Sequence, residues 1–156
     1  MISGTLFAFH KLPLVMYLAA ILIFLNEVKG KSALTLSRDL GVQYKTAFVL
    51  AHKIREAMAA EIKGTMVGGD GRTAEIDGAC TNQAESFFSR IRRAEIGHYH
   101  HISGPYLHRY AQEAAFREDH RRTSNGEQLS RVVSLVTRNR PSVDFCGYWQ
   151  RSRAAA

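Results

Sequence analysis

The stretch "AEIDGACTNQAESFFSRIRR", Ala74 to Arg93, decides what the second half of this chain can fold into. It begins with a short predicted strand, "AEID", which ends in the acid Asp77. An amphipathic helix, "AESFFSRIRR", follows almost at once, since only four residues separate Asp77 from Asn82. Each half looks like part of an active site. The question is whether two such fragments can form a site across so short an interval.

Asp77, Asn82 and Glu85 carry the hard oxygen ligands that Mg²⁺ prefers. Two such ions can stabilise the attacking and leaving oxygens of a phosphodiester. Asn82 and Glu85 are three residues apart, so a helix would place them on one face. The same residues also fit a helix N-cap that is followed by acids in the first turn, which is a purely structural pattern. Both interpretations are open from the residues alone.

Upstream, residues 32–55 have the outline of a helix-turn-helix: a short helix, a tight turn at Gly41 and a longer helix. Gly41 can adopt the positive φ that the turn needs. The stripe of apolar residues on the second helix predicts which face is buried, and it leaves a polar face for solvent or a major groove. The alternative is a plain helical hairpin with a solvated face. The predicted DNA-contacting residues are Arg38, Gln43, Lys45, Thr46 and Lys53, with Val49 on the same exposed face.

Composition agrees with an anionic partner. The net charge is +7, and 46% of the residues are hydrophobic, as in a globular protein. Cys80 and Cys146 are lone thiols without metal-ligand spacing, which is typical of a reducing cytosol. The apolar stretch 12–25 is shorter than a membrane span and is predicted to be a buried helix.

The rest of the chain also predicts helices. Ser103 is a candidate N-cap of the helix that is predicted to follow it, and Pro105 falls in the first turn of that helix. Pro141 ends the last predicted helix of the chain. The segment "GHYHH", residues 97–101, suggests a zinc site, but no acid or cysteine completes a tetrahedral set. An aromatic, polar loop is the favoured interpretation of that segment.

These stretches together resemble bacterial insertion-sequence transposases of the DDE class, the ISXO-like group. The resemblance rests on "ALTLSRDLGVQYKTAFVLAHKIREAM", "AEIDGA" and "TNQAESFFSRIRRAEIGHYHHISGPYLHRYAQEAAFREDHRR", in that order. It implies a zinc ribbon, a helix-turn-helix and an RNase H-like catalytic domain using Mg²⁺. It places the first catalytic metal ligand on Asp77 and the last member of the triad on Asn82, with Glu85 as the alternative.

The chain departs from that family in two places. No cysteine-rich ribbon precedes the helix-turn-helix, which suggests an N-terminal truncation. The body of the catalytic domain, including the second catalytic Asp, has no counterpart between Asp77 and Asn82. Because "DGA" resembles both the end of the first block and the start of the last, we hypothesise a deletion between two copies of that short repeat. Comparing the gene with an intact copy tests this, and a missing block bounded by other sequence would refute it.

Four residues cannot replace the missing domain. An RNase H-like sheet has about five strands of about five residues each, joined by crossovers of about a dozen. We therefore expect a truncated transposase that binds transposon-end DNA, cuts no DNA and holds no Mg²⁺. The alternatives are an active metal-dependent nuclease using Asp77, Asn82 and Glu85, a helix-turn-helix transcriptional regulator, and an unstable pseudogene product.

The expected fold is mainly α, with at most one or two short strands. We predict a helix-turn-helix domain over residues 1–62, a Gly-rich linker with the remnant strand over 63–83, and a helical remnant of the RNase H-like domain over 84–156. Helices that once covered a sheet should pack on one another or on the 12–25 helix. We expect a cytoplasmic protein without membrane contact, and a homo-oligomer if apolar surface stays uncovered.

Overall fold

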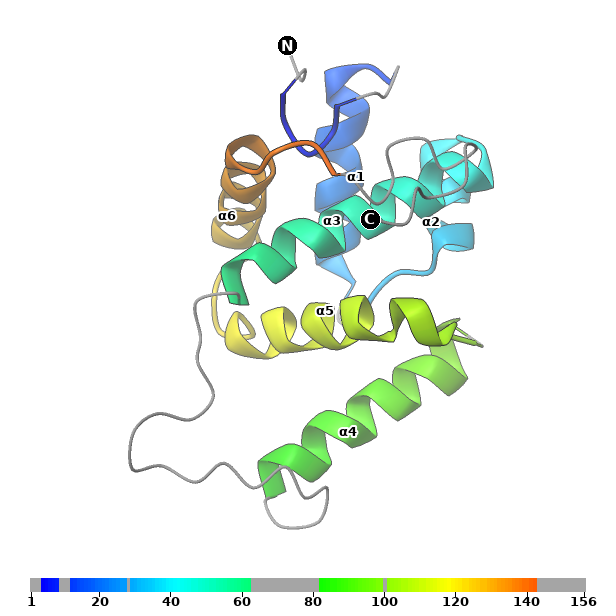
Figure 1. The fold of residues 1–156 in the computed structure, drawn as a ribbon, viewed down its shortest axis with the longest axis vertical. Helices are drawn as coiled ribbons and strands as arrows, with labels where there is room; N and C mark the ends of the chain where they lie inside the picture. The colour runs from blue at the N-terminus through cyan, green and yellow to red at the C-terminus, as the bar shows by residue number, and fades with distance from the viewer. Residues whose placement is uncertain (1–3, 9–11, 28, 63–81, 100, 143–156) are drawn as a thin grey trace, which may run out of the picture.

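The computed structural model describes residues 4–8, 12–27, 29–62, 82–99 and 101–142 (Figure 1). Every regular element within these ranges is helical, as the sequence predicts. The α-helices are α1 (Leu14–Asn26), α2 (Ala33–Leu40), α3 (Tyr44–Ile62), α4 (Asn82–Ala94), α5 (Leu107–Asp119) and α6 (Asn125–Arg138). A π-helical turn (Glu95–Tyr99) and a 3-10 turn (Gly104–Tyr106) join α4 to α5.

Helix α3 lies at the centre of the molecule. It packs against α1, α2, α5 and α6, while α1 also packs on α6 and α2 (Figure 1). Helix α4 lies at the lower edge in Figure 1 and packs on α5 and on the π-helical turn that continues it. Among the later helices, α5 packs on α3 and α6 packs on both α1 and α3.

One hydrophobic core joins the two halves of the chain. The N-terminal half supplies most of its buried side chains, and α5 and α6 close it from the other side. The described positions of this core include Tyr17, Ile21, Phe24, Leu50, Ile54, Met58, Phe116, Val132 and Val136. Residues on both sides of the predicted boundary near residue 62 thus contribute to the same core.

Local signals explain the helix ends. Ser32 Oγ accepts a hydrogen bond from the Thr35 N–H at 3.1 Å, which caps α2. Ser124 and Glu127 form a capping box at the start of α6. The cap predicted at Ser103 is wrong: its side chain makes no cap hydrogen bond, and a 3-10 turn precedes α5. Pro105 fixes that turn instead.

Helix α1 is only partly covered. Leu14, Val15, Leu18 and Leu22 are exposed, with 73% of Val15 accessible. Within the described part of the chain, no helix is long and apolar enough to cross a membrane.

Candidate nucleic-acid interface

A tight turn at Gly41 connects α2 to α3, at the position that the sequence predicts. Gly41 adopts a left-handed conformation with φ +63°, which residues that carry a side chain rarely adopt. The Val42 N–H donates to the Ser37 carbonyl at 3.0 Å, so the last carbonyls of α2 are satisfied as the chain reverses. The local sequence thus ends α2 and starts α3 with three residues between the two helices.

The start of α3 and the last turn of α2 present polar side chains to solvent. Arg38, Gln43 and Lys45 are exposed, and Thr46 is half-buried. In helix-turn-helix proteins the N-terminal residues of the second helix contact base edges, and neighbouring cations contact phosphates. This surface therefore has the chemistry for reading DNA. We call Arg38, Gln43, Lys45 and Thr46 the turn surface.

Lys53 does not belong to the turn surface, which corrects the sequence prediction of an exposed side chain. Only 1% of Lys53 is accessible, and its Nζ donates to the Ala8 carbonyl at 2.9 Å. Val49, predicted on the same exposed face, is also buried. The apolar stripe indicated one buried face, whereas α3 is enclosed by four helices beyond its first turn.

A buried ionic network fixes α3 against α5. Arg55 on α3 donates from Nε to Glu113 Oε2 on α5 at 2.6 Å, and both side chains are buried. Arg117 Nε donates to the other carboxylate oxygen of Glu113 at 2.9 Å. Burial alone would raise the pKa of Glu113, but the two guanidinium groups outweigh it and lower that pKa. Glu113 is therefore held as a carboxylate.

The same network reaches the end of α1. Arg117 donates from Nη2 to the Phe24 carbonyl at 2.8 Å and from Nη1 to the Glu27 carbonyl. Carbonyls in the last turn of a helix have no intrahelical partner, and a cation there also meets the negative end of the helix dipole. Arg55 further donates to the Lys31 carbonyl at 3.3 Å. Helices α1, α3 and α5 are thus held in one arrangement, which sets how the turn surface is presented.

Lys31 secures the connection between α1 and α2. Its Nζ lies 2.7 Å from Glu27 and 2.7 Å from Asp39, and the side chain is buried. Burial lowers the pKa of Lys31, but the hydrogen bonds to Asp39 and Glu27 outweigh burial and raise it. The short helix α2 is therefore anchored electrostatically at the base of the turn surface.

His52, in the N-terminal half of α3, is part of an aromatic cluster. Its ring centroid is 4.4 Å from that of Phe48 and 4.8 Å from that of Tyr106. Burial, reinforced by the charges of Arg55 and Arg109, lowers the pKa of His52 to about 3. The imidazole is therefore neutral at physiological pH and serves as a packing group.

The side chains of the residues assigned to catalysis by resemblance lie outside the described part of the structure. Asp77 lies outside the described residues, and Asn82 and Glu85 lie in the first turn of α4, where only the backbone is described. Among the described side chains no group of three His, Cys, Asp or Glu converges on a metal position, the "GHYHH" histidines that are described included.

Sequence reasoning missed the buried network. Glu113 and Arg117 stand four apart on a predicted helix, a spacing that typically pairs side chains at the surface. Nothing in the pattern of α3 marks Arg55 as buried, since its burial depends on α1 and α5 arriving from distant parts of the chain.

Comparison with known proteins adds one finding. Residues 56–119 match the family model of the ISXO2-like transposase domain. The match runs from the middle of α3 to the end of α5, so it contains Asp77, Asn82, Glu85 and Glu113 but not the turn surface. Neither a curated protein nor a solved structure gives a significant match.

Proposed function

We propose that this chain is a DDE-class insertion-sequence transposase, as its ISXO2-like segment at residues 56–119 suggests, and that it binds transposon-end DNA through the turn surface but does not cut or join DNA. The observation that carries the proposal is the exposure of Arg38 on α2 and of Gln43 and Lys45 at the start of α3, on the two sides of Gly41, whereas the rest of α3 is largely buried in the core.

Two features support the loss of catalysis. Four residues between Asp77 and Asn82 are too few for even one strand and its crossover. In addition, Phe116 of α5 and Val132 of α6 are buried in the core shared with α1 and α3, so these apolar side chains are already covered without a sheet. Intact members of the family use Mg²⁺, and we propose that this chain has no Mg²⁺-dependent step. Its proposed location is the cytoplasm, where the DNA is.

The test is fluorescence anisotropy with a labelled duplex that carries the terminal repeat of an intact relative's element. We expect Lys45→Ala and Arg38→Ala each to weaken binding several-fold and to reduce the salt slope by about one. Gln43→Ala should reduce the preference for the terminal repeat over a scrambled duplex, by up to about tenfold.

Arg138→Ala is the matched control. Arg138 is an exposed cation at the end of α6, which lies across the molecule from α2 in Figure 1. Its loss changes the net charge equally but removes nothing from the turn surface, so affinity should stay within about twofold. Equal effects of Lys45→Ala and Arg138→Ala would remove the turn surface from the proposal and leave only non-specific attraction.

Self-association stays a prediction. The exposed stripe of Leu14, Val15, Leu18 and Leu22 carries no charge and occupies one side of α1. Sedimentation velocity of the purified chain and of Val15→Glu distinguishes the outcomes: a dimer that Val15→Glu dissociates supports self-association through α1, and a monomer contradicts it.

A further inference from the structure

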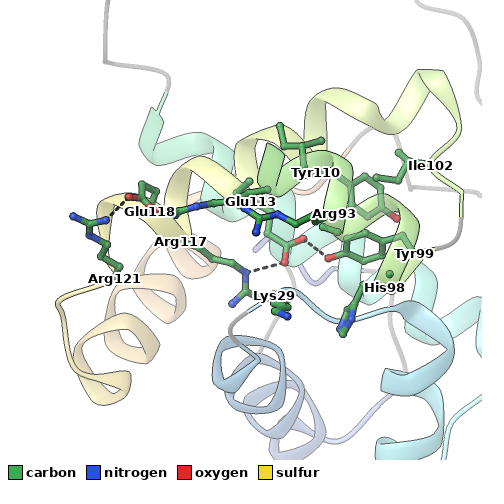
Figure 2. A pocket seen from close by; sticks show the side chains of 15 residues that line it. Lys29, Arg93, His98, Tyr99, Ile102, Tyr110, Glu113, Arg117, Glu118 and Arg121 are labelled. Atoms are coloured by element: carbon green, nitrogen blue, oxygen red, sulfur yellow. Dashed lines mark hydrogen bonds and ion pairs between the residues drawn. The ribbon is translucent and has the colours of Figure 1, made fainter. Parts of the chain in front are cut away.

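A pocket of about 530 Å³ lies between α4 and α5 (Figure 2), and none of the residues that line it belongs to the turn surface. Helix α4 supplies Arg90 and Arg93 to its wall, the following π-helical turn supplies Tyr99, and α5 supplies Tyr110 and Glu113. Lys29, from the connection between α1 and α2, closes one side. Pockets of this size hold small organic ligands.

The acids of this pocket already have partners. Glu113 is bonded to Arg55 behind the pocket and to Arg117, as Figure 2 shows for the second pair. Glu118 pairs with Arg121 at 2.7 Å and with Arg90. The carboxylates are therefore neutralised by residues of the protein itself. Positive charge is left over around the pocket.

Lys29 and Arg93 supply that remaining charge. Both are exposed, and neither forms an ion pair within the described residues. Arg93 donates to the carbonyl and hydroxyl of Ser89 at 3.1 Å each. A guanidinium carries five N–H donors, so Arg93 retains donors for a second acceptor. An ammonium and a guanidinium beside one cavity are the usual ligands of a phosphate group.

Two aromatic rings and several apolar side chains form the rest of the wall. The rings of Tyr99 and Tyr110 meet edge-on with centroids 4.6 Å apart. The Tyr99 hydroxyl donates to Glu113 Oε2 at 3.4 Å, which ties its ring to the buried network. Ile91 and Ile102 also contribute apolar surface. Such a wall suits a flat, weakly polar body, and nucleic-acid bases commonly pack on tyrosine rings.

We infer that this pocket binds a nucleotide that carries a terminal phosphate, with Lys29 and Arg93 on the phosphate and Tyr99 and Tyr110 on the base. The ligand could be a free nucleoside monophosphate or the 5′-phosphorylated end of a single strand, because the recognising chemistry is the same. The site does not depend on the proposed use of the turn surface.

Isothermal titration calorimetry of the full chain tests the inference with three probes: deoxyadenosine monophosphate, inorganic phosphate and deoxyadenosine. The monophosphate should bind at least tenfold more tightly than either part alone. Lys29→Ala and Arg93→Ala should each weaken it about tenfold, the effect of losing one charge-assisted contact, and Arg93→Lys should restore part of the loss. Both side chains are exposed, so melting temperatures should stay unchanged.

Two further variants separate this site from the turn surface. Lys45→Ala and Arg138→Ala should leave monophosphate binding unchanged, whereas Lys29→Ala and Arg93→Ala should leave duplex binding nearly unchanged. A 5′-phosphorylated trinucleotide is titrated beside the free nucleotide. Binding of either ligand that Lys29→Ala and Arg93→Ala both weaken supports the site, and it identifies which of the two ligands the site takes. No response to both, or binding that neither substitution weakens, overturns it.

Discussion

Replacing Glu113 with glutamine is expected to lower the free energy of unfolding by about 3–5 kcal/mol, because it leaves buried guanidinium charge without a counter-charge. Glu113 accepts from Arg55 at 2.6 Å and from Arg117 at 2.9 Å, and it is almost inaccessible to solvent. Glutamine has nearly the same shape, so packing is preserved and the loss reports charge. Urea unfolding monitored by circular dichroism measures it.

Glu118→Gln is the control on the same helix. Glu118 is half-buried and pairs with Arg121 and Arg90, which are themselves largely exposed. Such pairs contribute at most about 1 kcal/mol. The double variant Arg55→Met with Glu113→Leu should lose less than the sum of the two single changes, because it removes both charges. Equal losses in Glu113→Gln and Glu118→Gln would contradict the view that the buried network holds α3 in place.

The second large effect is a loss of stability between pH 6.5 and pH 4.5 that depends on His52. In the folded protein the pKa of His52 is lowered to about 3, while the unfolded chain binds its proton near pH 6.5. The unfolded state therefore binds more protons in this window. Stability is fully present above pH 6.5 and falls by about 1.4 kcal/mol per pH unit as the pH drops, or about 3 kcal/mol by pH 4.5.

His52→Leu should remove most of that slope, as measured by urea unfolding at several pH values. Phe48→Leu is the control: Phe48 packs on the His52 ring at 4.4 Å, so its loss should lower stability at every pH and leave the slope in place. An unchanged slope in His52→Leu would show that another group titrates. Glu113, whose pKa is lowered, contributes its own loss only as the pH falls below about 4.5.

The sequence predicts the helices well and their burial poorly. Ser32, Gly41 and Pro105 act locally, through a cap, a left-handed turn and a fixed φ, so their positions in the chain are enough to place the turns. The burial of Lys53 and Arg55 is set by helices far away in sequence. The hydrophobic periodicity of α3 predicts the face that one neighbouring helix covers. It does not predict which other residues become buried when four helices pack around α3.

The residues of the candidate sites fall into the same two groups, those placed by local sequence and those placed by the packing of distant segments. Arg38, Gln43 and Lys45 were predictable because they follow from the turn itself. The α4–α5 pocket was not, because Lys29 and Arg93 are distant in sequence and line the same pocket only through tertiary packing, with α4 on α5 and α5 bonded to the end of α1. The assignment of Asp77, Asn82 and Glu85 to a metal site comes from the resemblance alone. Under the proposed deletion, the four residues between Asp77 and Asn82 leave no room for the sheet that would bring these side chains together.

A cleavage assay tests the proposed loss of catalysis. A labelled duplex carrying the terminal repeat is incubated with saturating protein and Mg²⁺ or Mn²⁺, and the products are resolved on a denaturing gel. Our expectation is intact strands and no joined products, although the same mixture binds the duplex. Metal-dependent nicking or strand joining that Asp77→Asn abolishes would contradict it, because a chain with four residues between Asp77 and Asn82 would then have assembled a working nuclease site.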